Sequence, residues 1–208
     1  YDVGSYYKGE HLNDIWGLTT IGIAKSQEEM DAHLAKVDQS SVGTNWGVGD
    51  IMYADLDGDG KISNGTNKLG DTGDYRIIGN STPRFKYGIT LDAAWKGFDF
   101  SIFMKGIGKR DLWLDGCYFW GANGQGNEWQ STGFAEHWDF FRPEGDPLGA
   151  NLNSYYPRVN FSGDRNTKVQ TRYLQNGAYL RLKNVQLGYT LPRVWTEKAG
   201  ISSVRVYV

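Results

Sequence analysis

The sequence predicts an all-β protein of antiparallel, up-and-down strands. Glycine (28 residues) and aromatic side chains (14%) are both abundant, which favours strands and turns over helices. Long segments alternate apolar and polar residues, and the connections between these segments alternate between short and long. Together these features are typical of a transmembrane β-barrel, in which one face of each strand is apolar. The mean hydropathy of −0.53 agrees with this class, because alternation keeps the average low.

The first expected strand runs from Asp14 to Ala24, a segment rich in β-branched and aromatic residues. It is followed by a short acidic helix that starts at Ser26 and reaches about Lys36. Ser26 and Glu29 have the spacing of a capping box, so Ser26 is the expected N-cap. A solvated surface helix explains this segment without any further function.

The second and third expected strands form a hairpin. From Phe85 to Trp95, apolar residues alternate with polar or small ones, and the alternation resumes after Lys96-Gly97 with Phe98. A two-residue link that contains glycine predicts a tight hairpin turn. Trp95 and Phe98 flank this turn, where an aromatic girdle of a barrel would anchor it in lipid.

The fourth expected strand runs from Tyr173 to Leu191, and its alternation changes phase at Lys183-Asn184, which predicts a β-bulge. A helical turn over residues 194–199 then ends at Gly200, and a fifth strand runs from about Ile201 to the end. The last residues still alternate, so the chain is expected to be a piece of a larger protein.

The two long connections cover roughly residues 25–83 and 110–172. Because long and short links alternate, both long links are expected at the same end of the strands. Outer-membrane barrels have this asymmetry, with short periplasmic turns and long external loops. A soluble β-sandwich remains the alternative.

An acidic segment in the first long link resembles half of a calcium-binding loop. Carboxylates at alternate positions are followed by a glycine and by a residue that would give its backbone carbonyl, with Ile62 in the local core. The expected ligands are Asp55, Asp57, Asp59 and, through its carbonyl, Lys61. Thr66 stands where the closing glutamate would be, so Asp71 or Asp74 would have to close the site. The alternative is an Asx-rich turn without an ion.

The second long link is unusually aromatic, and its aromatic residues surround a flexible, polar stretch at residues 121–126. Aromatic rings beside amides suit sugar rings, whose apolar faces stack while their hydroxyls form hydrogen bonds. Trp120 and Trp129 are the two expected ligand contacts. The remaining aromatics are expected to fold the link or to contact a partner protein.

Enzymatic activity is not expected. The three histidines are far apart and form no zinc motif, and Cys117 has no nucleophile signature. Glu136, Asp139 and Glu144 are the residues that a glycosidase pair could use, although exposed loop carboxylates are common. The net charge of −2 with well-mixed signs predicts no nucleic-acid partner.

Several segments, in this order and spacing, resemble the C-terminal half of the SusC/RagA-type TonB-dependent outer-membrane receptors. No single segment is diagnostic, and the resemblance rests on their joint occurrence over about residues 14–208. The segments are Gly49-Asp50-Ile51, Asp55 to Gly60, Ile77 to Asn80, Pro83-Arg84-Phe85, Lys96 to Asp99, Tyr179 to Val185, Leu187 to Pro192 and Gly200 to Tyr207.

The resemblance implies a large barrel in the bacterial outer membrane, of the kind that Bacteroidota use to import glycans or peptides. It also implies two partners: a SusD-like surface lipoprotein that acts as a lid, and TonB, which would contact an N-terminal plug. The plug and the final strands are expected to lie outside this chain. The alternative function is a soluble, calcium-dependent carbohydrate-binding β-sandwich module.

Overall fold

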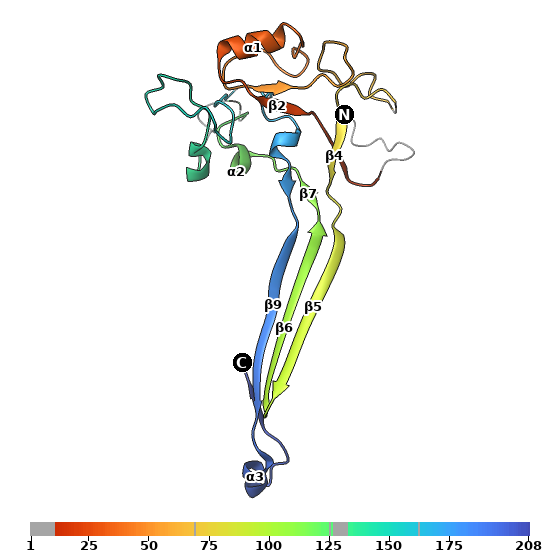
Figure 1. Ribbon diagram of the computed structural model, residues 1–208, viewed down its shortest axis with the longest axis vertical. Coiled ribbons are helices and arrows are strands. Elements are labelled where there is room, and N and C mark those ends of the chain that lie inside the picture. The colour runs from red at the N-terminus through yellow and green to blue at the C-terminus, as the bar shows by residue number, and fades with distance from the viewer. Residues whose placement is uncertain (1–10, 69, 125, 127–132, 162) are drawn as a thin grey trace. The chain divides into compact units, whose positions relative to one another are not determined.

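The computed structural model describes residues 11–68, 70–124, 126, 133–161 and 163–208. The chain divides into two compact units, each built from two separate segments (Figure 1). Unit 1 contains residues 1–81 and 111–175, and unit 2 contains residues 82–110 and 176–208. Among the described residues, no helix is long and apolar enough to cross a membrane.

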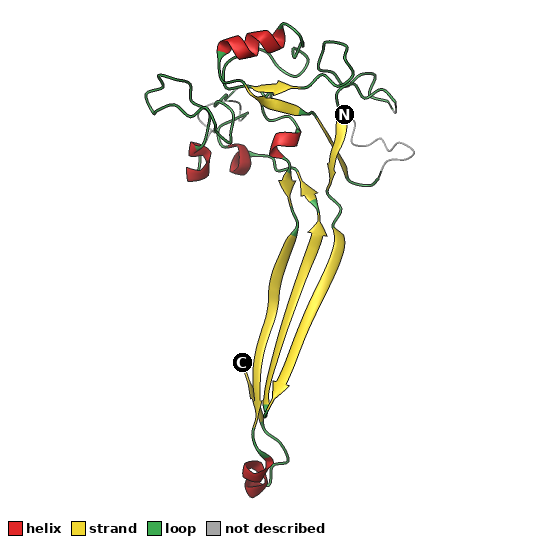
Figure 2. Ribbon diagram, viewed as in Figure 1, coloured by secondary structure: helices red, strands yellow, loops and turns green. Residues whose placement is uncertain are grey.

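Unit 2 is a four-stranded antiparallel sheet in the order β10-β9-β6-β5 (Figure 2). Its strands are β5 (Arg84–Trp95), β6 (Phe98–Lys109), β9 (Tyr179–Thr190) and β10 (Arg205–Tyr207). A helical turn made of α3 (Arg193–Thr196) and η3 (Glu197–Ala199) joins β9 to β10. It ends at Gly200 with a φ of 72°, which confirms the expected helix end.

The turn between β5 and β6 has the predicted two-residue form. Trp95 pairs with Phe98, and the residues between them, Lys96 and Gly97, have φ values of 48° and 88°. Two consecutive positive φ values are the signature of a type I′ turn, whose twist matches that of the strands it joins.

The register places the apolar residues of three strands on one face of the sheet. Leu91 pairs with Ile102, which pairs with Val185, and directly opposed residues share a face. Two further rows of three residues lie on this face. One row is Ile89, Met104 and Leu182, and the other is Ala93, Phe100 and Leu187. The strands therefore present one continuous apolar surface.

The predicted bulge in β9 is confirmed, and it keeps that surface continuous. Phe103 pairs with Asn184 while its neighbour Met104 pairs with Leu182, so Lys183 is the extra residue. Because side chains alternate with a period of two, the extra residue returns Leu182 to the same face as Val185.

The apolar surface of unit 2 is exposed. All residues of β5 are exposed, with values such as 74% for Phe85 and 54% for Leu91. A folded protein in water rarely leaves such a large contiguous apolar patch uncovered. The three long strands have 12 residues each, which exceeds the ~9–11 that a tilted strand needs to cross a bilayer.

Unit 1 is made of short elements. In its first segment, β1 (Asp14–Gly17) pairs with β4 (Arg76–Asn80), β2 (Thr20–Ile23) pairs with β3 (Ile51–Tyr53), and α1 covers Gln27–Leu34. The elements of the second segment are β7 (Asp111–Leu112), α2 (Cys117–Trp120), η1 (Ala135–Trp138), η2 (Thr171–Tyr173) and β8 (Gln175–Asn176). The expected strand beginning at Tyr173 therefore starts later, at Tyr179.

The single strand expected over Asp14–Ala24 is wrong, because the chain changes partner at Leu18. The Leu18 N–H donates to the carbonyl of Val169 at 2.9 Å, and the Leu18 carbonyl accepts from Thr171 at 3.0 Å. Gly17 lies so close that a Cβ there would be 2.7 Å from the Val169 oxygen. The segment therefore becomes two short strands, each with its own partner.

The expected helix cap is confirmed. The Ser26 hydroxyl accepts from the N–H of Glu29 at 3.2 Å, and the helix begins at the next residue, Gln27. In a usual capping box the Glu29 carboxylate would accept from the N–H of the N-cap residue, Ser26. Here it accepts from the N–H of Lys25, one residue earlier, at 2.7 Å.

One hydrophobic core unites the two segments of unit 1. Its buried members are Leu18, Ile23, Val42, Ile51, Tyr53 and Ile62 from the first segment and Trp120, Phe141, Tyr156 and Tyr173 from the second. Neither segment has this core alone, so the two long connections fold together as one body.

Candidate functional site

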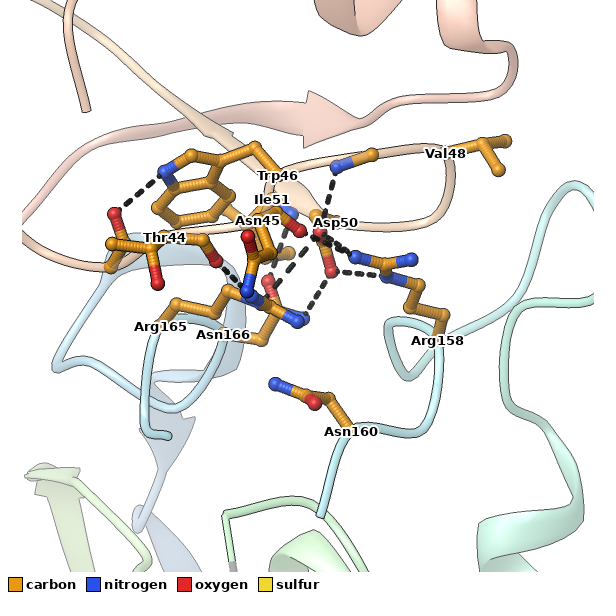
Figure 3. A network of polar contacts seen from close by, with 12 residues as sticks. Thr44, Asn45, Trp46, Val48, Asp50, Ile51, Arg158, Asn160, Arg165 and Asn166 are labelled. Atoms are coloured by element: carbon orange, nitrogen blue, oxygen red, sulfur yellow. Dashed lines mark hydrogen bonds and ion pairs between the residues drawn. The ribbon is translucent and has the colours of Figure 1, made fainter. Parts of the chain in front are cut away.

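A buried carboxylate holds the two segments of unit 1 together (Figure 3). Asp50 is fully buried and accepts hydrogen bonds from Nε and Nη2 of Arg158 at 2.7 and 2.6 Å. It also accepts from Nδ2 of Asn166 at 2.8 Å and from the N–H of Gly47 at 2.9 Å. Four donors satisfy the carboxylate, which is the condition for burying a charge at low cost.

A second arginine lies beside Asp50, so two cationic groups face one carboxylate. Nε of Arg165 lies 3.7 Å from the Asp50 carboxylate, and burial lowers the pKa of Arg165 while the nearby Asp50 raises it. The Arg165 guanidinium also donates to the carbonyl of Thr44. This network has a scaffold role, because Asp50 bonds to two side chains of the second segment and to the backbone of its own segment. Nε of Arg165 is buried and has no hydrogen-bond partner among the described residues. No spacing in the sequence predicts this network.

Trp120 lies in the aromatic part of the core. Its side chain is only 2% exposed, and its ring centroid lies 4.7 Å from that of Tyr173 and 5.1 Å from that of Phe119, both in edge-to-face arrangements. Such pairs stabilise a fold beyond the area they bury. Trp120, expected as a ligand contact, therefore helps to hold unit 1 together.

The same residue borders an aromatic pocket of about 260 Å³. The residues that line it are Trp120, Ala122, Asn123, Gly133, Phe134, His137, Trp138, Phe140, Tyr156 and Val159. None of them carries a carboxylate, ammonium or guanidinium group. Trp129, the other expected ligand contact, lies outside the described residues.

The walls of this pocket are held in place by contacts behind them. The Arg142 guanidinium lies 4.9 Å from the ring centre of Phe140 and 5.4 Å from that of Trp138. Its nitrogens donate to the carbonyls of Trp138 and Gly149. Both aromatic rings are therefore supported by a cation that is itself fixed.

His137 is a structural member of the pocket wall. Its Nδ1 accepts from the N–H of Phe134 at 2.9 Å, and its Nε2 lies 3.1 Å from the carbonyl of Phe119. An Nε2 facing a carbonyl must donate, so the ring is neutral with its proton on Nε2. Both nitrogens are engaged, which leaves no lone pair for metal binding.

The acidic segment brings three carboxylates together: Asp55, Asp57 and Asp74 each have an oxygen within 4.8 Å of the other two. Asp74 is fully buried and accepts from the N–H groups of Leu56 and Ser63 at 2.6 and 2.8 Å. Its position is therefore fixed by one backbone N–H inside the acidic loop and one just after it. Asp74 was one of the two residues that the sequence offered to close the site.

The remaining expected ligands have other neighbours. Asp59 accepts from the N–H of Lys61 at 2.8 Å and is not part of the cluster of three carboxylates. The backbone of Lys61 forms an isolated β-bridge with Asp38, and Ile62 is fully buried, as expected.

Asp55 belongs to the cluster and also holds the backbone of the loop. It accepts from the N–H groups of Gly58 and Gly60 at 2.6 and 2.8 Å, which is the geometry of an Asx-rich turn.

The partly buried Asp55 and the exposed Asp57 of this cluster differ in acidity. The N–H of Gly60 is the main cause that lowers the pKa of Asp55. The N–H of Asp59 lowers the pKa of Asp57, but desolvation and the charges of Asp74, Asp59 and Asp55 outweigh it, so the pKa of Asp57 is raised. Like charges held close together attract a proton or a cation.

Comparisons with known proteins give three informative matches and no matching protein-family model. The chain is 32% identical over 161 residues to the TonB-dependent receptor P3 of Formosa agariphila, a match that covers 77% of this chain. It is 29% identical over 203 residues to the TonB-dependent receptor P26 of the same organism, covering 96% of this chain. It spans only 14% and 18% of the lengths of these relatives.

A solved structure has the same fold. The match is to the RagAB peptide importer in its closed-closed state, with a TM-score of 0.53 and 20% identity. It covers 93% of this chain and 18% of the matched chain. With the antiparallel sheet of unit 2, this likeness confirms the fold class predicted from the sequence.

Proposed function

Because this chain belongs to the SusC/RagA-type TonB-dependent receptors, we propose that its unit 2 forms part of the wall of an outer-membrane transporter. The observation that carries the proposal is the exposed apolar surface of β5, β6 and β9. Lipid is the medium in which such a surface is stable, and a barrel wall satisfies every backbone group through its neighbouring strands.

The opposite face of the sheet supports the same assignment. Asp92 pairs with Ser101, which pairs with Gln186, so this polar row lies on the face away from the apolar one. In a barrel that contains a transport path, the inward face is polar. The sheet thus has one face suited to lipid and one suited to a water-filled interior.

Unit 1 would then stand at the external mouth of the transporter. Its first segment leads into β5 and its second segment joins β6 to β9, in each case at the strand end opposite the Lys96-Gly97 turn, and external loops of such barrels are the long ones. We propose that the transporter imports glycans or peptides together with a SusD-like lipoprotein, powered through TonB. The aromatic pocket of unit 1, whose described lining carries no ionised group, favours glycans.

The acidic cluster adds a proposed cation site. Three carboxylates within 4.8 Å of one another are a ligand set that calcium prefers, and their mutual repulsion would be relieved by the ion. We propose Asp55, Asp57 and Asp74 as its carboxylate ligands. An ion there would stiffen the segment between Asp55 and Asp74.

The transporter proposal is tested on the natural full-length protein. An antibody against residues 84–191 follows it through cell fractionation and through gels of unboiled and boiled samples. A heat-modifiable band in the outer membrane is expected, since folded barrels resist detergent until they are heated. A soluble band that boiling does not change would reject the transporter and favour the calcium-dependent sandwich.

A further inference from the structure

The basic side chains of the three long strands of unit 2 are gathered in one part of the sheet. Those in the half away from the Lys96-Gly97 turn are Arg84, Lys86, Lys105, Lys109 and Arg181, and a sixth, Lys183, is the bulge residue of β9. Asp92 and Asp99 are the only carboxylates of β5, β6 and β9, and both belong to the half near the turn. The two signs of charge are therefore separated along the sheet.

The basic residues of the far half share the polar face of the sheet. Lys105 lies four residues from Ser101 in β6, and side chains alternate with a period of two, so both point to the polar face. Lys105 is directly opposite Arg181 in β9, and directly opposed residues share a face. The same alternation and pairing along β5 and β6 add the others. We call these exposed residues the cation ladder: Arg84, Lys86, Lys105, Lys109 and Arg181.

The cation ladder brings like charges close to one another. Lys105 is directly opposite Arg181, and Lys109 is directly opposite Arg84. Lys86 is a diagonal neighbour of both Lys105 and Lys109. Directly opposed Cα atoms lie about 4.5–5.5 Å apart and diagonal neighbours about 7–8 Å apart. The five cations therefore form one connected series across β5, β6 and β9.

No counter-charge within the described residues balances this series. None of the ion pairs in that part of the chain includes a residue of the cation ladder. Like charges directly opposite each other destabilise a sheet, so the pair of Lys105 and Arg181 has a cost. The Arg181 guanidinium lies 4.4 Å from the ring centre of Tyr179, which orients the group and leaves its charge in place. A bound anion would relieve the repulsion.

The side chains of the cation ladder restrict what can bind there. Lysine and arginine offer hydrogen-bond donors and no acceptors, so they suit a ligand whose charged groups only accept, such as carboxylates or sulfates. A peptide also carries a backbone N–H on nearly every residue, for which the cation ladder offers no acceptor. Sugar hydroxyls can rotate to accept, so a glycan meets these donors without such a loss.

We propose that the cation ladder binds anionic glycans, with carboxylate or sulfate groups of the glycan lying between Lys86, Lys105 and Arg181. A series of cations exceeds what one small anion needs, which favours a ligand that carries several charged groups. This inference rests on the proposed function, in which the polar face lines a water-filled interior. It narrows the imported glycans to charged ones.

The test measures binding to the full-length receptor in detergent by calorimetry at several salt concentrations. The probes are oligogalacturonates and chondroitin sulfate oligosaccharides, with cello-oligosaccharides as neutral counterparts and tetraglutamate as an acidic peptide. Lys105→Glu places a carboxylate opposite Arg181, which disrupts the site while adding an ion pair to the sheet. Lys198→Glu is the matched control, the same change at an exposed lysine of η3 outside the long strands.

We expect at least one charged oligosaccharide to bind tenfold or more tightly than the neutral ones, with an affinity that falls as salt is added. Lys105→Glu should weaken this binding tenfold or more, while the variant unfolds in urea no more easily than the unaltered receptor. Lys198→Glu should leave the binding unchanged. Weaker binding without a loss of stability separates a ligand contact from a structural role of Lys105.

Electrostatic attraction tolerates different linkages, so equal or absent binding of every charged oligosaccharide overturns the proposal. Binding of charged sugars that Lys105→Glu does not weaken overturns it as well, and so does tetraglutamate binding without sugar binding. Uptake of labelled oligosaccharides by cells is measured separately. Binding of a charged oligosaccharide without its uptake rejects transport and keeps the cation ladder as a glycan site. Uptake of neutral glycans, with no charged oligosaccharide bound, rejects that site and keeps transport.

Discussion

Asp50 and Arg158 are separated by 108 positions in the chain and form a two-point ion pair with distances of 2.6 and 2.7 Å. Asp50 is fully buried, and the Arg158 N–H donates to the carbonyl of the adjacent Gly49 at 2.8 Å. The pair therefore fixes side chains and backbone at the same point of contact between the two segments of unit 1.

Replacing Asp50 by asparagine should destabilise unit 1 by about 3 kcal/mol, because two arginines would lose their buried counter-charge. The measurement is hydrogen exchange in the full-length receptor. It follows the amides of Leu18 and Thr171, whose hydrogen bonds join the two segments of unit 1. Glu28→Gln is the control, since this exposed carboxylate lies on the surface of α1. Unchanged exchange in Asp50→Asn would contradict the role given to the network.

Replacing Ile89 by arginine should destabilise the barrel by about 2–4 kcal/mol if this residue lies near the middle of the membrane. Ile89 belongs to the apolar surface of unit 2, opposite Met104. Thr90→Arg is a matched control one residue away on the other face, where a charge would meet water. Urea unfolding in lipid vesicles measures both variants. Equal losses of unfolding free energy in Ile89→Arg and Thr90→Arg would show that Ile89 does not face lipid.

Replacing Gly97 by alanine should destabilise the β5–β6 hairpin by more than about 1 kcal/mol, because its φ of 88° is unfavourable for residues with a Cβ. The added Cβ would also lie 3.0 Å from the carbonyl oxygen of Thr190. Lys96→Asn should be neutral or stabilising, since asparagine before glycine is preferred in type I′ turns. The same unfolding assay compares them, and a stable Gly97→Ala variant would argue against this turn.

Calcium affinity should fall as the pH falls, because the ligands must be deprotonated. The pKa of Asp57 is raised and that of Asp55 is lowered, so protonation of Asp57 should begin the loss while Asp55 is still ionised. Calorimetric titration of the full-length receptor at several pH values measures this. Asp57→Asn should weaken calcium binding at neutral pH. In this variant the fall of calcium affinity with pH should begin at a lower pH, because Asp57 no longer takes up a proton.

The ligand set of the cation site can be tested with two neighbouring variants. Asp74→Asn should weaken calcium binding tenfold or more, whereas Asp59→Asn should have a smaller effect, because Asp59 is not in the cluster of three carboxylates. An equal loss in Asp59→Asn would favour the arrangement of a standard calcium loop. Absence of calcium binding in the unaltered protein would favour an Asx-rich turn.

The parts of the fold that depend on local sequence could be predicted. The alternation of β5 and β6, the Lys96-Gly97 turn and the Lys183 bulge are each determined by residues close together in the chain. The break at Leu18 could not be predicted, because it depends on pairing with Val169 and Thr171. A strand-forming composition does not indicate which distant segment will supply the partner.

In the candidate sites, too, the sequence predicted what depends on nearby residues and not what depends on distant ones. The carboxylates of Asp55 and Asp57 are visible in the sequence as a motif, while Asp74 was one of two options and only the fold brings it to them. Asp50 appeared in the sequence only as part of a family-like segment, and nothing linked it to Arg158 or Asn166, because buried ion pairs have no characteristic spacing. The Trp120 pocket combines residues from three short stretches, so the sequence could indicate aromatic abundance without indicating a cavity.

The shared core of unit 1 has a consequence for how such proteins diversify. Leu18 and Tyr53 pack in one cluster with Trp120 and Tyr173, although the β5–β6 hairpin separates these pairs in the chain. Substitutions at residues in contact have coupled effects on stability. A substitution at a core position of one connection therefore changes the environment of the core residues of the other. Chimeras between relatives should exchange residues 11–81 and 111–175 together, since either segment alone would meet a foreign core.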